Sequence, residues 1–192
     1  NPYGCPRPVI LRGMNTPREL GFTMPPEWAP HAAVWTAWPA GEDHWEGYLE
    51  QVRDDFAGFL RVLSSFERVE LIVRSEEAEN DARARLIGCD VGFHRRMHDD
   101  IWLRDCAPIF VTNGSEIAAV DWIFNGWGDK FKHDLDNQLP EFIAEVTGVQ
   151  RFVPNVVMEG GALEVNGAGV LLTTRQCLLE KHLNPSLTAA DL

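Results

Sequence analysis

The sequence lacks any cluster of basic residues: it has 17 Lys and Arg against 29 Asp and Glu, for a net charge of −12. Nucleic acids and anionic membranes are bound by Lys and Arg clusters, so neither is an expected partner. No stretch is long and apolar enough to span a bilayer, and Asn1–Asn15 has neither the basic start nor the apolar core of a signal peptide. The expected location is therefore the cytoplasm.

Cysteine is also scarce, and no residue is a convincing nucleophile. The four cysteines (Cys5, Cys89, Cys106 and Cys177) form no CxxC pair, so reduced thiols are expected. Cys106 directly follows Asp105, whose charge would raise the thiol pKa and suppress the thiolate. Cys177 lies among Thr and Leu, as a buried structural cysteine does. The sequence contains neither a Gly-x-Ser-x-Gly elbow nor a phosphate-binding loop.

A metal site is not expected either. His94, His98, Asp99 and Asp100 cluster in the sequence, and the two histidines have one metal-like spacing. The segment lacks the Glu of a zincin helix, however, and residues 95–96 between the histidines are both Arg, which would repel a cation. We predict no metal site.

The chain length of 192 residues and 45% hydrophobic content suit one domain with a real core. Residues 1–23 are predicted to be irregular, and residues 24–192 to form one domain without an internal boundary. Hydrophobic patterns predict strands at 32–38, 69–73, 91–97, 108–111, 117–122, 149–153, 162–165 and 170–174, and helices at 45–66, 75–87 and 134–147. The class is therefore α/β with mixed sheets.

The segment Asp99–Asp105 (DDIWLRD) places Trp102 three residues before a carboxylate. If this segment is extended, Trp102 and Arg104 face one way, and Asp105 points into a cleft at the end of a strand. An aromatic face attracts a planar cation, and a carboxylate accepts two parallel N–H bonds from a guanidinium. The alternative is a core strand in which Asp105 only pairs with a neighbour.

A second lone carboxylate, Glu159, follows a β-branched run and precedes two glycines that would let a ligand or another backbone approach. After Asp105 and after Glu159 the chain repeats strand, Asn-Gly and strand, and the two Asn-Gly pairs lie 53 positions apart. Such a repeat suggests modules around an axis, each contributing one acid. In Asn125–Lys130, glycines allow a tight loop that presents Trp127, although a simple turn with one packed aromatic fits equally well.

Four segments together resemble the agmatine deiminase family, a Porphyromonas-type peptidyl-arginine deiminase group within the pentein superfamily. They are MPPEWAPH at 24–31 with 35–39, DIWLRD at 100–105, FNGWGDK at 124–130 and EGGALEV at 159–165. The resemblance implies a pentein-type α/β propeller of repeated ββαβ modules, of which the first two to three of five would be present here.

By the same resemblance, Asp105 binds the substrate guanidinium and Trp102 flanks it. Glu159 would hydrogen-bond the guanidinium or a catalytic histidine. The implied reaction is hydrolysis of agmatine to N-carbamoylputrescine and ammonia, a step of putrescine and polyamine synthesis, through a Cys thiolate and without a cofactor.

The chain departs from the family pattern because it contains neither a Gly-His-x-Asp segment nor a Gly-rich segment carrying the nucleophilic Cys. His182 is not in such a setting. The chain is therefore expected to be the N-terminal, guanidinium-binding part of the enzyme and to be inactive by itself. Its expected partners are agmatine and the missing C-terminal modules, and a second copy of the chain is an open alternative. Two other hypotheses remain: a deiminase of another guanidine such as peptidyl-arginine, and a non-catalytic guanidine-binding or assembly protein.

Overall fold

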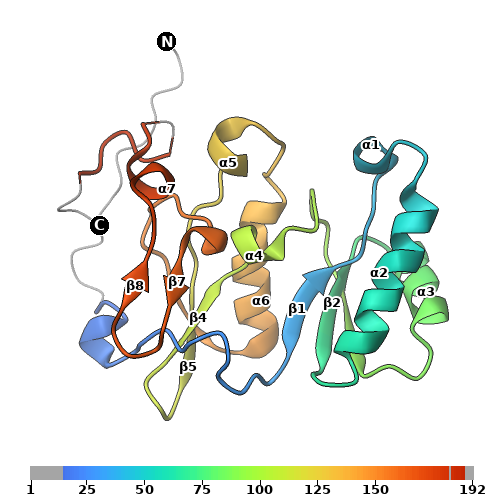
Figure 1. Ribbon diagram of the computed structural model, residues 1–192, viewed down its shortest axis with the longest axis horizontal. Helices are drawn as coiled ribbons and strands as arrows, with labels where there is room; N and C mark the ends of the chain where they lie inside the picture. The colour runs from blue at the N-terminus through green and yellow to red at the C-terminus, as the bar shows by residue number, and fades with distance from the viewer. Residues whose placement is uncertain (1–14, 182, 189–192) are drawn as a thin grey trace. The chain divides into compact units, whose positions relative to one another are not determined.

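The computed structural model describes residues 15–181 and 183–188, so Cys5 and His182 lie outside the described residues. Contacts divide the chain into two compact units. Residues 30–103 make up one, the β1–β3 unit, and the described parts of 1–29 and 104–192 make up the other, the β4–β8 unit. Each contains helices and strands (Figure 1). A single domain over residues 24–192 stays a prediction, because modules of one repeat domain would also separate into contact-dense units.

The β1–β3 unit is a parallel sheet in the order β1-β2-β3 with helical crossovers. Its elements are β1 (Val34–Ala37), α1 (Glu42–Trp45), α2 (Leu49–Leu63), β2 (Val69–Val73), α3 (Glu76–Arg85) and β3 (Val91–Arg95). All three predicted strands are confirmed. The predicted helix at 45–66 begins only at Leu49, because Glu46 and Gly47 have positive φ angles of 36° and 87° and interrupt it.

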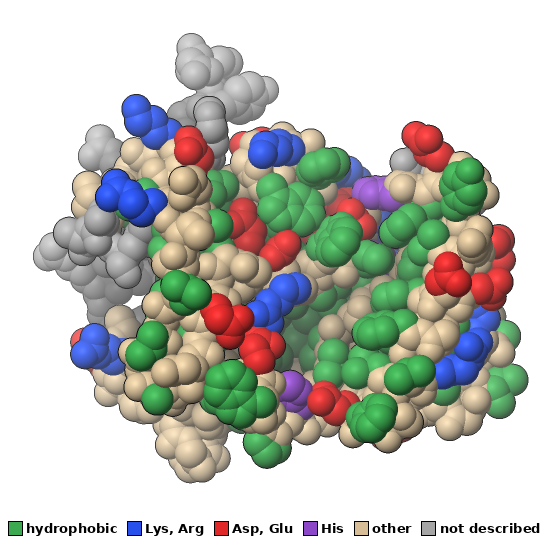
Figure 2. All heavy atoms as spheres, in the orientation of Figure 1, with side chains coloured by type: hydrophobic (Ala, Val, Ile, Leu, Met, Phe, Trp, Pro, Cys, Tyr) green, Lys and Arg blue, Asp and Glu red, His purple; other side chains and the backbone are tan. Residues whose placement is uncertain are grey.

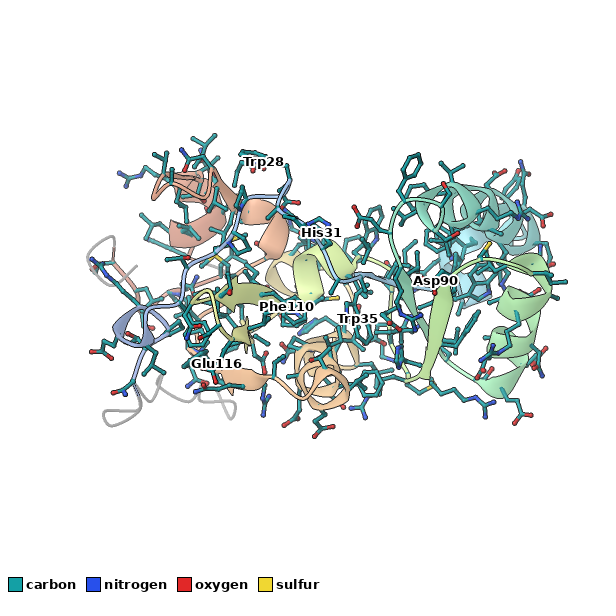
Figure 3. The ribbon with its side chains drawn as sticks, turned by 90° about the horizontal axis from the view of Figure 1, so that it is seen from below. Trp28, His31, Trp35, Asp90, Phe110 and Glu116 are labelled. Carbon is teal, nitrogen blue, oxygen red and sulfur yellow. The ribbon has the colours of Figure 1, made fainter. Side chains whose placement is uncertain are left out.

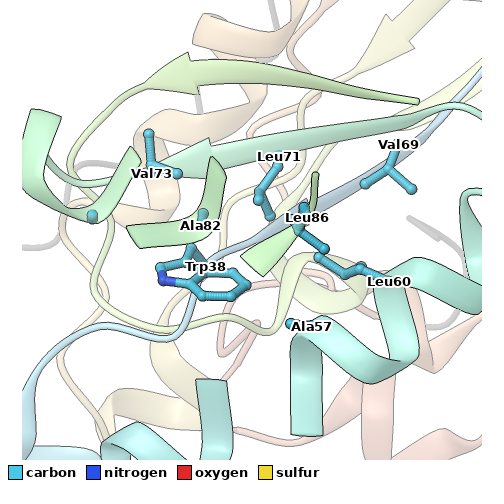
Figure 4. Close-up of a cluster of buried hydrophobic side chains, with 9 residues drawn as sticks. Trp38, Ala57, Leu60, Val69, Leu71, Val73, Ala82 and Leu86 are labelled. Carbon is cyan, nitrogen blue, oxygen red and sulfur yellow. The ribbon is translucent and has the colours of Figure 1, made fainter. Parts of the chain in front are cut away.

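The core of this unit lies between α2, α3 and one face of the sheet (Figure 4). The buried side chains are Trp38, Ala57, Leu60, Val69, Leu71, Val73, Ala78, Ala82 and Leu86. The Trp38 indole keeps a polar partner, because its Nε1–H donates to Asp81 Oδ2 at 3.2 Å. Ser75 caps α3, as predicted, by accepting a hydrogen bond from the Ala78 N–H at 3.2 Å.

The β4–β8 unit contains a three-stranded sheet in the order β4-β5-β6 and a two-stranded sheet of β7 and β8. Its elements are η1 (Arg18–Leu20), β4 (Ile109–Thr112), β5 (Ile117–Val120), α5 (Gly126–Asp129), η2 (Asp136–Gln138), α6 (Leu139–Thr147), β6 (Gln150–Phe152), η3 (Gly160–Ala162), β7 (Glu164–Val165), β8 (Leu171–Leu172) and α7 (Arg175–Leu179). The short helix α4 (Leu103–Cys106) contains the boundary between the units. Part of the segment predicted to be irregular is ordered, since Thr23 forms an antiparallel bridge to Thr112.

Both predicted hairpins are confirmed: β4 pairs antiparallel with β5, and β7 with β8. The first turn is longer than a two-residue Asn-Gly turn, because the Asn113 side chain accepts hydrogen bonds from the Ser115 and Glu116 N–H groups. The second hairpin begins later than predicted, because Gly160–Ala162 form the 3₁₀ helix η3 rather than the start of a strand.

Helix α6 leads back to a strand parallel to β5, so β4, β5, α6 and β6 run strand, strand, helix, strand. The β1–β3 unit has a different order, with a helix between each pair of strands. The mixed α/β class is therefore confirmed. None of the helices in the described part of the chain has the length and apolar character needed to cross a membrane.

Candidate functional site

Asp105 lies on a helical turn, not at the end of an extended strand as predicted, because Leu103–Cys106 form α4. Leu103 and Cys106 are 5% and 2% exposed. Residues three apart share one face of a helix, so the turn buries these two apolar side chains together. A strand would have placed Asp105 on the same face as Leu103 and buried the carboxylate with it. The helical turn therefore keeps Asp105 off the apolar face.

Both oxygens of the Asp105 carboxylate accept a hydrogen bond. The Trp127 indole Nε1–H donates to Oδ2 at 3.1 Å, and the Gly161 backbone N–H donates to Oδ1 at 3.0 Å. These contacts join the predicted sites around Asp105, Trp127 and Glu159, which are far apart in the sequence. Each carboxylate oxygen has a second lone pair, so Asp105 can still accept hydrogen bonds from a ligand.

The two glycines after Glu159 are needed for this close packing. A Cβ on Gly160 would overlap the backbone carbonyl oxygen of Arg104, and a Cβ on Gly161 would overlap Asp105 Oδ1. The expectation that these glycines allow another backbone to approach is thus confirmed for Gly160. Arg104 also pairs with Glu27 of the first motif segment, at 2.6 Å. Trp28, which follows Glu27 in the sequence, is 73% exposed and lies at the edge of the β4–β8 unit (Figure 3).

Trp127 is held in an unusual backbone conformation. Four consecutive residues, Gly126 to Asp129, have positive φ angles of 62°, 58°, 86° and 59°, which make a single left-handed turn. The left-handed conformation costs roughly 1–2 kcal/mol for each residue other than glycine, and two glycines reduce the sum. The Asn125 side chain stabilises the turn by accepting the Gly128 N–H at 2.9 Å. Phe124 packs edge-on against the Trp127 ring, with ring centroids 5.0 Å apart.

The segment before Glu159 is aligned with the segment before Trp127. Ile123 and Val157 form a parallel bridge, in which the Ile123 N–H donates to the Val156 carbonyl at 3.0 Å. On the other side of this segment, the Asn184 side chain accepts from the Val157 N–H at 3.0 Å and donates to the Val157 carbonyl at 2.8 Å. Asn184 is 7% exposed, and no sequence pattern pointed to it.

Glu159 is 7% exposed, and burial raises the pKa of its carboxyl above the ordinary value. The negative charge of Asp105 raises this pKa further, whereas the backbone N–H of Glu159 and the charge of Lys130 act in the opposite direction. The site therefore holds two carboxyl groups, one exposed enough to receive hydrogen bonds and one whose negative charge is poorly compensated. A planar cation would relieve that imbalance.

Trp102 and the two cysteines considered as nucleophiles differ in their exposure. Trp102 belongs to the β1–β3 unit and is 53% exposed, so its place beside Asp105 stays a prediction. Cys106 is buried, and Cys177 is partly buried at the start of α7, where its N–H donates to Thr174 Oγ1 at 3.2 Å. Among residues 15–181 and 183–188, no three His, Cys, Asp or Glu side chains converge as metal ligands.

Known proteins match nearly the whole chain. The model of the Porphyromonas-type peptidyl-arginine deiminase family matches residues 23–192. An agmatine deiminase of Ectopseudomonas mendocina is 37% identical over 184 residues, which are 92% of this chain and 50% of that protein. The solved agmatine deiminase of Enterococcus faecalis has a TM-score of 0.87 and 33% identity, covering 93% of this chain and 50% of that one.

A solved putative arginine deiminase from Porphyromonas gingivalis has a TM-score of 0.75 and 28% identity, covering 88% of this chain and 52% of that one. The chain thus spans about half the length of the relatives it matches. The family model, by contrast, matches most of the chain. This chain belongs to the Porphyromonas-type peptidyl-arginine deiminase family.

Proposed function

We propose that this chain is the guanidinium-binding part of an agmatine deiminase-like hydrolase. The observation that carries the proposal is the Asp105 carboxylate, which the Trp127 indole and the Gly161 N–H hold in place beside the buried carboxyl of Glu159. The net charge of −12 and the acidic side chains at many places on the visible face (Figure 2) also favour a cationic ligand.

A guanidinium is the cation that this arrangement suits. Its parallel N–H groups match the free lone pairs of one carboxylate, and bonds of this charge-assisted kind are roughly twice as strong as neutral ones. The positive charge would also lower the pKa of Glu159 and so favour the ionised form of this carboxyl. Asp105 would orient the substrate, and Trp102 would flank it.

The proposed reaction converts agmatine and water to N-carbamoylputrescine and ammonia, a source of putrescine. A cysteine thiolate adds to the guanidinium carbon, and a histidine protonates the departing amino group, which leaves as ammonia. Water then hydrolyses the thiouronium intermediate to N-carbamoylputrescine and the free thiolate. Asp105 and Glu159 hold the cation during these steps. The attacking cysteine belongs to a Gly-rich motif that these 192 residues do not contain, so we expect this chain to bind agmatine without turning it over.

Isothermal titration calorimetry with agmatine tests the proposal. Putrescine is the matched control ligand, because it keeps the amine and lacks the guanidinium. Agmatine should bind and putrescine should not, and Asp105→Asn should weaken agmatine binding by about tenfold to a hundredfold, since it removes a charged acceptor. Equal affinities for the two ligands, or an unchanged affinity in Asp105→Asn, would exclude a guanidinium site at this carboxylate.

A second candidate substrate is peptidyl-arginine, which the description of the matching family model favours. An N-acetyl-arginine amide, titrated in parallel, separates the two substrates: tighter binding of this ligand than of agmatine would assign the chain to peptidyl-arginine. A non-catalytic guanidine-binding protein would bind either ligand, but its full gene product would release no ammonia.

We also propose that the two units are modules of a pentein-type propeller and that further modules of the protein pack on the β7–β8 sheet. The sheet has only two strands, which are marginal alone, and Val170, Leu171 and Leu172 are 61%, 53% and 70% exposed. Ultracentrifugation and thermal melting test this. A monomer with a sharp transition at high temperature would show that the sheet needs no such cover.

A further inference from the structure

The backbone just before Trp102 is held by two side chains of the β1–β3 unit. The Arg74 guanidinium donates from Nη2 to the Asp99 carbonyl at 2.5 Å. The His98 ring is hydrogen-bonded through Nδ1 to the Asp100 carbonyl at 3.1 Å. A carbonyl only accepts, so Nδ1 carries the proton and His98 has a fixed tautomer. Two successive peptide groups are thereby fixed.

The next residues are fixed as well. The Asp100 side chain accepts the Ile101 N–H at 2.8 Å, and its other oxygen lies 3.4 Å from His44 Nδ1. The Ile101 carbonyl then accepts the Leu103 N–H at 2.8 Å. The backbone of residues 99–101, just before Trp102, therefore has a hydrogen bond at each residue. Trp102 itself is 53% exposed.

His98 and the Nε end of the partly buried Arg74 side chain are buried at a cost that packing alone does not explain. His98 is 0% exposed, and its Nε2 has no hydrogen-bond partner within the described part of the chain. The Arg74 Nε is buried without a partner in the same way. A Cβ on Gly41 would lie 3.0 Å from Arg74 Nη1, so this glycine leaves room for the guanidinium. Buried polar groups that are only partly satisfied are costly, and strained or costly arrangements gather at functional sites.

We propose that Arg74 and His98 are positioning residues that fix the backbone before Trp102, so that its indole meets the guanidinium of the substrate in one orientation. This inference rests on the proposed function, which gives Trp102 its ligand. An exposed tryptophan on a mobile backbone would lose side-chain and backbone freedom on binding, and prior fixation removes that loss.

The test uses the 192-residue chain with Arg74→Met and His98→Leu, each of which removes one of the two bonds. His98→Asn is the matched control, because the Asn amide nitrogen replaces Nδ1 and keeps the donor. Arg85→Met is the stability control: Arg85 pairs at 2.7 Å each with Asp81 of α3 and Glu50 of α2, neither of which belongs to the segment before Trp102. The measurements are agmatine affinity by calorimetry and the ¹⁹F resonance of Trp102 in chain labelled with fluorotryptophan, assigned through Trp102→Phe.

Arg74→Met and His98→Leu should each weaken agmatine binding about tenfold, the range of a lost cation–π contact, and should broaden or shift the Trp102 resonance. His98→Asn and Arg85→Met should keep both readouts, although Arg85→Met melts at a lower temperature. An unchanged Trp102 resonance in Arg74→Met and His98→Leu overturns the inference, as does an equal loss of affinity in Arg85→Met. If the parent chain binds no agmatine, the proposed function is wrong. The role of Arg74 and His98 in orienting Trp102 toward the substrate is then wrong too, whatever the Trp102 resonance shows.

Discussion

Alanine at each of the two glycines that follow Glu159 should separate folding from binding. In Gly161→Ala the new Cβ overlaps Asp105 Oδ1, the end of a side chain that can rotate. In Gly160→Ala it overlaps the Arg104 carbonyl, which is fixed backbone. Neither glycine has a positive φ, so the effect of alanine at both positions is steric. The first substitution should therefore displace the carboxylate, and the second should strain the fold.

The magnitudes follow from these contacts. To reach an ordinary contact distance of about 3.5 Å, the Asp105 carboxylate must move by on the order of 1 Å in Gly161→Ala. This breaks its bond from the Gly161 N–H, and a hydrogen bond to a charged group is worth about 1.5–3 kcal/mol, or about tenfold to a hundredfold in agmatine affinity. In Gly160→Ala the backbone shift should lower the free energy of unfolding by about 1–3 kcal/mol.

The assay is agmatine titration together with urea unfolding of both variants. Gly58→Ala is the matched control, because Gly58 lies within α2 and its Cβ would meet only Arg61 at 3.9 Å. This control should keep the affinity and gain stability, by about 0.5–1 kcal/mol. If Gly161→Ala binds agmatine with the affinity of the parent, the hydrogen bond from the Gly161 N–H to Asp105 is not needed for binding, and this reasoning is wrong.

Three further changes probe neighbouring features. Trp102→Phe should weaken agmatine binding less than Trp102→Ala, because phenylalanine keeps a ring for the cation. Trp102→Ala should lose about 0.5–2 kcal/mol of binding free energy. If these variants lower the melting temperature as much as the calorimetric affinity, Trp102 has a packing role instead. Burial lowers the pKa of His98 from 6.5 to about 4. Between these pH values His98 is protonated in the unfolded chain and neutral in the folded chain. The free energy of unfolding should therefore fall by up to about 3 kcal/mol as pH drops from 6.5 to 4, and His98→Asn should flatten this part of the urea-unfolding profile; an unchanged profile would mean that His98 does not carry the effect. Asn184→Ala should leave the Val157 N–H and carbonyl without their partner and lower the free energy of unfolding by about 1–3 kcal/mol; a melting temperature equal to that of the parent would show that water replaces the amide.

The strands and hairpins could be predicted because their signals are local. The run Val69–Val73 is β-branched and apolar, as a buried parallel strand is, and the residues at Asn113 and Asn166 mark turns. Helix α4 could not be predicted, because a four-residue segment is too short to distinguish a period of 2 from one of 3.6. Its burial of Leu103 with Cys106 depends on tertiary packing.

The site was predictable in its residues and not in its contacts. Glycines on both sides of Trp127 indicate a tight loop, and the loop is confirmed as a left-handed turn. No local pattern, however, predicts that the indole donates to a carboxylate 22 positions earlier. Asn184 carries still less signal, because its partner Val157 is 27 positions away and an Asn before a proline reads as an ordinary turn.

The structure of this chain with agmatine bound is the most direct test of the central claim. The account predicts that two guanidinium nitrogens lie about 2.7–3.2 Å from the Asp105 carboxylate oxygens, with the cation also facing Glu159. A guanidinium bound elsewhere, with Asp105 still holding only the Trp127 indole and the Gly161 N–H, would contradict the account.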